Sequence, residues 1–118
     1  MQSLLFSPLK IGDLEIKNRV VMPPMCMYKA KDENGLPRCF HRLHYAARAL
    51  GGVGLIIVEA TAAEPRGRIT SRDLGLWNDE QLEVHAGLIK GCVKQGAAMA
   101  VWLAHTGRKS ECEEVDRA

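Results

Sequence analysis

Residues 53–58 form an unbroken apolar run, Val-Gly-Leu-Ile-Ile-Val, that leaves few folds open to this chain. A run of this length without polar alternation is typical of a strand that is buried on both faces. Such strands belong to parallel sheets, because the helices that connect parallel strands also cover the sheet. The run therefore predicts an α/β protein built on a parallel sheet.

The segment before this run predicts a hairpin followed by a short strand. Leu9–Ile11 and Leu14–Ile16 alternate apolar and polar residues around a two-residue turn, Gly12-Asp13. Arg19–Met22 is then a short, mostly apolar run that stops at Pro23-Pro24. Because proline has no N–H to give to a neighbouring strand, we expect the strand to end there.

Two helices are predicted from apolar residues at helical spacing. The first begins near Phe40 and ends at Gly51-Gly52. The second begins at Asn78, with Gln81 three residues on as its capping partner, and ends at Gly96. The apolar stripes are Phe40, Leu43, Ala47 and Leu50 in the first helix, and Leu82, Ala86, Ile89 and Val93 in the second.

A third apolar strand, Ala98–Ala104, completes the order hairpin, strand, helix, strand, helix, strand. Alternation of this kind predicts parallel strands joined by right-handed crossovers. We expect Val20–Met22, Val53–Val58 and Ala98–Ala104 to be parallel and adjacent in that order. Periodicity leaves two architectures open, a doubly wound sheet and the opening of a (βα)8 barrel. A small nucleotide-binding module of the first kind is disfavoured, because no Gly-x-Gly-x-x-Gly follows a strand.

Charge and composition exclude several classes of function. Lys and Arg total 16 and Asp and Glu total 14, so the net charge is +2, with both signs mixed along the chain. Proteins that bind nucleic acid or acidic membranes gather cations on one face. No run of about 18 apolar residues is present, and Met1–Phe6 is too short for a secretory signal. We expect no nucleic-acid partner and no membrane.

The cysteines indicate neither a disulfide framework nor a metal site, since none of them forms a Cys-x-x-Cys pair. Cysteines without a disulfide pattern are typical of proteins in the reducing cytoplasm, so we expect a cytoplasmic location. Zinc needs three or four ligands at close spacing, and no neighbouring cysteine or carboxylate completes a set with His41 and His44. We expect no metal. The cysteines are Cys26, Cys39, Cys92 and Cys112.

Active groups of parallel α/β proteins lie at the carboxyl ends of the strands. Three such ends are visible, at residues 23–28, 59–62 and 103–108, and reactive or polar side chains gather at two of them. We therefore expect any catalytic site to be built from these segments.

The same segments resemble the Old Yellow Enzyme family. Residues 18–28, Asn-Arg-Val-Val-Met-Pro-Pro-Met-Cys-Met-Tyr, resemble its first-strand motif, and the cysteine and tyrosine resemble its thermophilic-like ene-reductase class. Residues 40–45 are similar to the first barrel helix, 54–62 to the second strand with 67–68 in the next loop, and 103–109 to the end of the third strand. These blocks follow in family order along essentially the whole chain.

The resemblance implies a (βα)8 TIM barrel and an FMN-dependent, NADPH-oxidising enzyme that reduces activated, enone-like C=C bonds. Residues 1–118 would supply the hairpin (9–16), a β-α-β-α-β unit (19–109) and a polar tail (110–118). Because such a barrel typically needs about 250 residues, we expect an incomplete barrel that is inactive alone. The alternative is a non-catalytic α/β fragment, or half of a split barrel, that acts only by associating with a complementing chain or another copy.

The resemblance also implies roles for matching residues. Cys26 and Tyr28 would be catalytic: the Cys26 thiol would tune the flavin, and the Tyr28 hydroxyl would bind the substrate carbonyl. The cofactor-binding residues would be Pro23, Pro24, Met25, Cys26 and Ala60. The chain departs from the family at Trp102, where a glutamine usually pairs with the flavin. An indole has one donor and no acceptor, so Trp102 cannot reproduce that contact.

Overall fold

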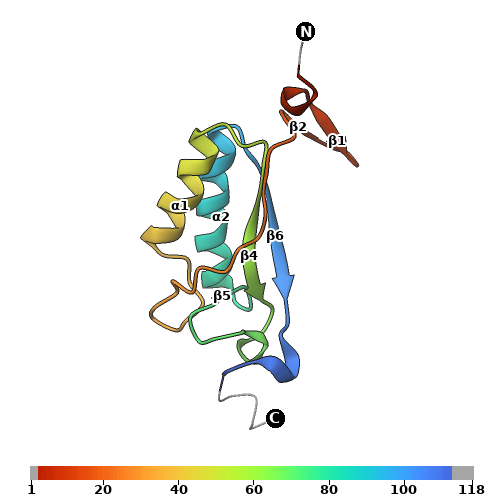
Figure 1. Ribbon diagram of the computed structural model, residues 1–118. Helices are drawn as coiled ribbons and strands as arrows, with labels where there is room; N and C mark the ends of the chain where they lie inside the picture. The colour runs from red at the N-terminus through yellow and green to blue at the C-terminus, as the bar shows by residue number, and fades with distance from the viewer. Residues whose placement is uncertain (1–2, 113–118) are drawn as a thin grey trace.

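Strand β4 (Leu55–Ala62) lies at the centre of the parallel sheet in the computed structural model, which describes residues 3–112 (Figure 1). It pairs in parallel with β3 (Val21–Met22) on one edge and with β6 (Ala98–Ala104) along the other. A short strand that the sequence did not predict, β5 (Leu74–Gly75), pairs with the end of β4. The expected parallel order, with the apolar run in the middle, is confirmed.

Helices α1 (Cys39–Leu50) and α2 (Asp79–Lys94) lie on one face of this sheet (Figure 1). The predicted capping pair of α2 is present: the Asn78 side chain accepts the Gln81 N–H at 2.9 Å, and the Gln81 side chain accepts the Asn78 N–H at 3.2 Å. Gly96 follows α2 with φ of +97°, a conformation that glycine adopts without strain.

The predicted apolar stripes of the two helices do not match the faces that enter the core, although Ile89 of the α2 stripe packs against the hydrophobic cluster. Leu43 and Leu50 of α1 are exposed, as are Leu82 and Val93 of α2. The buried faces carry polar residues that neighbouring segments supply with hydrogen bonds only in part: Gln81 donates to the Asn34 carbonyl, whereas His41 Nε2 and His85 Nδ1 have no partner among the described residues. These faces consist of His41, Tyr45 and Ala49 in α1, and Gln81, His85, Leu88 and Cys92 in α2.

One hydrophobic cluster fills the space between the helices and the sheet. The sheet supplies Met22, Ile56 and Val58, with Met99 and Val101 of β6 packed beside them. The helices contribute Tyr45, Ala49, Leu88 and Cys92. This cluster holds the helices and strands together, so the carboxyl ends of β3, β4 and β6 lie at the same end of the sheet.

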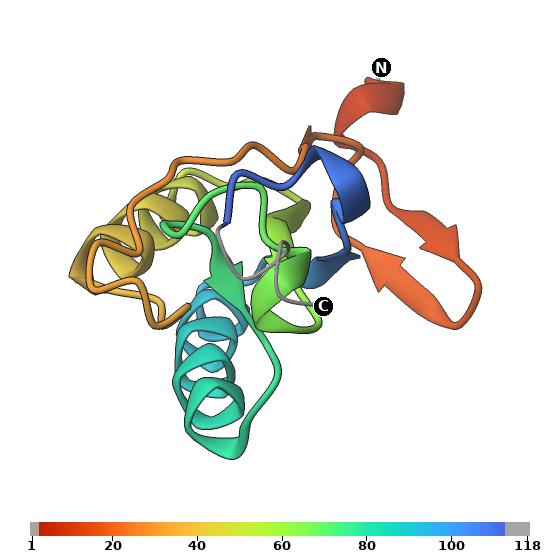
Figure 2. The ribbon, with the colours of Figure 1, turned by 90° about the horizontal axis from the view of Figure 1, so that it is seen from below.

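The N-terminal hairpin stands apart from the sheet and the helices (Figures 1 and 2). Its strands, β1 (Leu9–Ile11) and β2 (Leu14–Ile16), pair antiparallel in the predicted register, preceded by a 3-10 turn at Leu4–Phe6. Gly12 has φ of +59° in the two-residue connection, as a tight hairpin turn requires. The predicted hairpin is therefore confirmed.

Two 3-10 turns, Pro65–Gly67 and Gly107–Lys109, lie beyond the ends of β4 and β6. The residues assigned to the polar tail begin at Ser110, whose hydroxyl donates to the Arg68 carbonyl, and the Glu111 N–H donates to the Ile69 carbonyl at 2.7 Å. The rest of that segment, 113–118, is outside the described residues. Within residues 3–112, no helix has the length and apolar character needed to cross a bilayer.

Candidate active site

The carboxyl ends of β3 and β4 bring together Cys26, Tyr28 and Ala60. The Ala60 backbone and the Tyr28 hydroxyl lie close enough to the Cys26 thiol to lower its pKa. Cys26 is half-buried, Ala60 is buried, and the Tyr28 side chain is 41% exposed. Both residues expected to be catalytic therefore lie beside one expected to bind cofactor.

Pro23, Pro24 and Met25 connect the end of β3 to this cluster. The Pro23 and Met25 residues are exposed and Pro24 is half-buried, so the rest of the described chain leaves these residues accessible. An accessible apolar surface beside the small Ala60 side chain and a thiol donor fits a planar, partly polar ring such as a flavin. The exposed Pro23 and Met25, with half-buried Pro24 and Cys26 beside them, offer apolar surface and a thiol whose chemistry is compatible with FMN, while Ala60 is buried behind them.

Tyr28 has a left-handed backbone, with φ of +53°. A non-glycine residue in this region typically costs about 1–3 kcal/mol, and such residues cluster at functional sites. Two neighbouring hydrogen bonds hold the strained segment: the Met27 N–H donates to Glu59 Oε2 at 3.1 Å, and the Ala30 N–H donates to the Arg72 carbonyl at 3.1 Å. The Tyr28 hydroxyl lies close enough to Cys26 for the two groups to act on each other's pKa.

Burial raises the pKa of the Cys26 thiol, and the negative charges of Asp73 and Glu59 raise it further. The hydrogen bonds from Ala60 and Tyr28 oppose this rise. Because the pKa stays above its ordinary value, Cys26 is a neutral thiol near neutral pH. Desolvation and the neighbouring Cys26 also raise the pKa of the Tyr28 hydroxyl. The site therefore presents two neutral groups that can donate hydrogen bonds.

A bulge in β4 directs the neighbouring residues Glu59 and Ala60 toward different parts of the structure. The pairing of β4 with β6 shifts between Val58 and Thr61, so Glu59 and Ala60 lie opposite Trp102 alone. Bulges re-aim side chains and are common next to active sites. Here the Ala60 backbone acts on the pKa of the Cys26 thiol, whereas the Glu59 side chain accepts a hydrogen bond from Tyr45 of α1.

Trp102 lies on the face of β6 that the helices do not cover. Its neighbour Val101 packs against the core, and successive side chains of a strand point to opposite faces. Trp102 is 50% exposed and Leu103 is 60% exposed. The indole thus stays available to a ligand or to further protein, as a donor without an acceptor.

The sequence did not identify Glu59, Tyr45 and His41 as a connected buried group behind this site. Glu59 is 1% exposed, and its carboxylate accepts a hydrogen bond from Tyr45 Oη at 2.9 Å. His41 Nε2 lies 3.8 Å from Glu59 Oε1. One sequence signal points to it: a glutamate that directly follows the apolar run 53–58 must be neutralised or hydrogen-bonded if it is buried.

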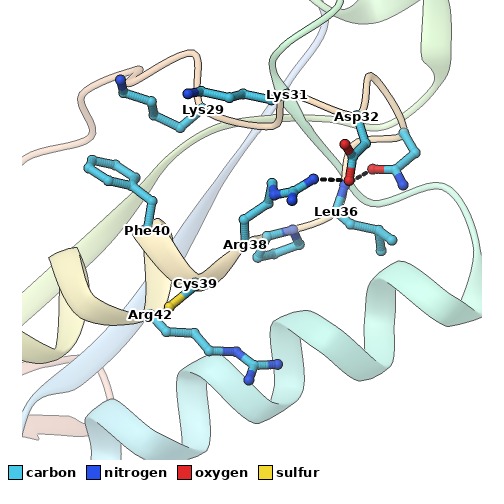
Figure 3. A pocket seen from close by; sticks show the side chains of 10 residues that line it. Lys29, Lys31, Asp32, Leu36, Arg38, Cys39, Phe40 and Arg42 are labelled. Carbon is cyan, nitrogen blue, oxygen red and sulfur yellow. Dashed lines mark hydrogen bonds and ion pairs between the residues drawn. The ribbon is translucent and has the colours of Figure 1, made fainter.

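A basic pocket of about 610 Å³ begins one residue after Tyr28 but contains none of the predicted site residues. Figure 3 shows Lys29, Lys31 and Asp32 on one loop of the wall. Arg38 extends toward Asp32 and forms an ion pair with it. The Lys29 ammonium lies 5.6 Å from the centre of the Phe40 ring. This cavity adjoins the candidate site along the chain, and four of its ten lining residues are Lys or Arg against a single acidic residue, Asp32.

His105, at the end of β6, has a structural partner. Its Nε2 lies 2.6 Å from Glu64 Oε1, and Arg66 Nε donates to the same oxygen at 2.9 Å. These contacts attach the end of β6 to the loop after β4, so His105 has a structural role here.

Comparison with known proteins places this geometry in a family. The family model described as NADH:flavin oxidoreductase / NADH oxidase matches residues 4–118. The NADPH dehydrogenase of Bacillus subtilis (strain 168) is 50% identical over 113 residues, which cover 96% of this chain and 33% of that protein. The chain thus spans about a third of the length of the curated relatives it matches.

Solved structures of Old Yellow Enzyme family proteins also match the fold of this chain. The Old Yellow Enzyme from Pichia sp. AKU4542 superimposes with a TM-score of 0.87 at 27% identity, over 97% of this chain and 29% of that one. Morphinone reductase in complex with tetrahydroNAD gives a TM-score of 0.83 at 33% identity, over 92% of this chain and 29% of that one. The resemblance to the Old Yellow Enzyme barrel is therefore confirmed, with the described α/β unit matching part of that barrel.

Proposed function

Because the chain belongs to the NADH:flavin oxidoreductase / NADH oxidase family, we propose that it supplies part of the active site of an FMN-dependent ene-reductase. The family consists of oxidoreductases that use FMN and a nicotinamide donor. The proposed reaction is the NADPH-dependent reduction of an activated C=C bond in a small, enone-like molecule.

The contact among Cys26, Tyr28 and Ala60 carries this proposal. A neutral thiol and a phenol lie at the carboxyl ends of parallel strands, beside a small residue and an accessible apolar segment. Carboxyl ends of barrel strands are where enzymes of this architecture hold their catalytic groups. The strained backbone of Tyr28 supports the same conclusion, because strain of this kind concentrates at functional sites.

The residues that would hold FMN are Pro23, Pro24, Met25, Cys26 and Ala60. When bound, FMN supplies the capacity to accept a hydride from NADPH and to deliver one to the β-carbon of an activated alkene. The Cys26 thiol donates toward the negative charge of the reduced cofactor and so favours reduction. The Tyr28 hydroxyl donates to the substrate carbonyl and draws electron density away from the C=C bond.

The second candidate is a split-barrel half or a non-catalytic fragment whose role is association. The observation that favours it is the exposed apolar edge at Trp102 and Leu103, since uncovered sheet edges invite pairing with another chain. Such a chain would be colourless when purified, whereas a flavin-binding chain would be yellow.

Complementation tests the proposal. The chain is co-expressed with the C-terminal two-thirds of a relative such as the Bacillus subtilis NADPH dehydrogenase, and the purified sample is assayed with NADPH and 2-cyclohexenone. We expect flavin absorbance and enone-dependent NADPH oxidation from the pair, and neither from the chain alone at saturating FMN. A colourless, inactive but stably associated pair would contradict the ene-reductase proposal and favour the association role.

A further inference from the structure

Glu59 joins α1, β4 and the Cys26 segment through three hydrogen bonds. Its Oε2 accepts the Met27 N–H at 3.1 Å, and its Oε1 accepts the Tyr45 hydroxyl at 2.9 Å. The Glu59 backbone N–H donates in turn to Tyr45 Oη at 3.0 Å. This carboxylate is therefore the link between the main chain of the candidate site and the first helix.

The surroundings of Glu59 leave its charge without a cationic partner among residues 3–112. The nearest basic side chain is His41, whose Nδ1 accepts the Arg38 N–H at 2.9 Å, so that a neutral ring carries its proton on Nε2. Burial lowers the pKa of His41 to about 4, which keeps the ring neutral at neutral pH. Asp73 adds a second negative charge nearby.

The position of Glu59 in the chain connects it to every group of the candidate site. It directly precedes Ala60, whose backbone acts on the pKa of the Cys26 thiol. It also holds the amide of Met27, which lies between Cys26 and Tyr28. An amide side chain in the same position would place an NH2 donor where one of the two carboxylate oxygens now accepts, so it could not accept from both Met27 and Tyr45 in this geometry.

We propose that Glu59 is a positioning residue that holds the Cys26 thiol and the Tyr28 hydroxyl at the strand ends through the Met27 amide and the Tyr45 hydroxyl. This inference rests on the proposed function. It adds Glu59 to the candidate site as a residue that contacts neither cofactor nor substrate and acts through Met27 and Tyr45. Its negative charge also faces the thiol together with that of Asp73, so ionisation of Cys26 is disfavoured and the sulfur remains a hydrogen-bond donor.

The first test needs no flavin. The rate of iodoacetamide alkylation of Cys26 is measured against pH in the 118-residue chain, with each cysteine peptide resolved by mass spectrometry. We expect Glu59→Gln to move the Cys26 profile to lower pH and to raise its rate below the wild-type midpoint at least about threefold, because a buried like charge is removed. Exposed Cys39 in the same molecule is the internal reference.

Two comparisons make this outcome specific. Glu64→Gln removes an exposed carboxylate that pairs with His105 and Arg66, and we expect it to leave the Cys26 profile unchanged. Asp73 keeps its charge in both variants. A folded Glu59→Gln chain with the wild-type Cys26 profile would overturn the proposal, since a merely structural carboxylate would not move it.

Tyr45→Phe provides the second arm if Glu59→Gln does not fold. This variant retains the charge and removes the hydroxyl that fixes the carboxylate. We expect hydrogen exchange of the Met27 amide to accelerate at least fivefold relative to that of the Ala30 amide, which bonds to Arg72 instead. Equal protection of Met27 in both chains would overturn the proposal. FMN binding is measured in a separate experiment by flavin absorbance. A chain that fails to bind FMN would count against the proposed function but would not affect the alkylation and hydrogen-exchange results.

Discussion

The Tyr45 hydroxyl donates to the Glu59 carboxylate at 2.9 Å and accepts the Glu59 backbone N–H at 3.0 Å. One side chain of α1 thus makes two hydrogen bonds to a single residue of β4. Both residues are almost fully buried. The pair fixes the register of α1 on the sheet, and with it the position of the segment that carries Cys26 and Tyr28.

Tyr45→Phe is expected to lower the free energy of unfolding by about 2–4 kcal/mol, because it leaves a buried N–H and a buried carboxylate without their shared partner. Urea unfolding of the wild-type and variant chains measures this change. Leu43→Ala on the same helix is the matched control, since Leu43 is 67% exposed, and we expect it to stay within about 0.5 kcal/mol of wild type. Equal effects of the two substitutions would show that the hydroxyl contributes nothing.

Much of the framework could be predicted from local sequence chemistry. The apolar run identified β4, the Gly12-Asp13 turn placed the hairpin, and Asn78 with Gln81 placed the start of α2. These signals act between residues close in sequence, so a single chain reveals them without any knowledge of tertiary packing.

The helix faces could not be predicted in the same way. Periodicity favoured apolar residues such as Leu43 and Leu82, yet the buried positions include His41, Gln81 and His85. Their burial depends on acceptors and donors supplied by distant segments: Gln81 donates to the Asn34 carbonyl, for example. Cys26, Tyr28 and Ala60 were identified from family resemblance, while the Glu59 network behind them depends on a bulge that the apolar pattern does not encode.

Stability should fall between neutral and mildly acidic pH because of His41. Its pKa in the folded state is about 4 against an ordinary value of 6.5, mainly because burial disfavours the charged ring. The unfolded chain therefore binds more protons between these values, and the stability that the neutral ring confers above pH 6.5 is lost as the pH falls toward 4. The raised pKa of Glu59 acts in the opposite direction, since protonation relieves its burial.

Comparing wild type with His41→Asn isolates the contribution of His41 to the pH dependence of the unfolding free energy. His41→Asn keeps an acceptor for the Arg38 N–H but cannot titrate. From pH 7 to pH 5, we expect wild type to lose about 2 kcal/mol more unfolding free energy than His41→Asn. Urea unfolding at both pH values measures the difference. Parallel pH profiles for the two chains would contradict a buried, neutral His41.

Trp102→Gln should strengthen FMN binding in the complemented barrel, because the amide offers a donor and an acceptor where the indole offers only a donor. We expect the FMN dissociation constant to fall at least about fivefold, a gain on the order of one hydrogen bond. Flavin fluorescence quenching measures it. Leu103→Gln is the matched control at the adjacent position, which is 60% exposed against 50% for Trp102. A similar gain from both substitutions would assign the effect to general polarity.

The central claim is that Cys26, beside Ala60 and Tyr28, acts on a bound flavin. The most direct measurement is the flavin reduction potential of the complemented barrel with Cys26 or with Cys26→Ala, using Cys39→Ala as the control at an exposed cysteine. Removing the thiol donor should make the potential more negative, while protein stability changes by only about 1 kcal/mol. A Cys26→Ala barrel that binds FMN at the unchanged wild-type potential would contradict the account and leave Cys26 as a packing residue.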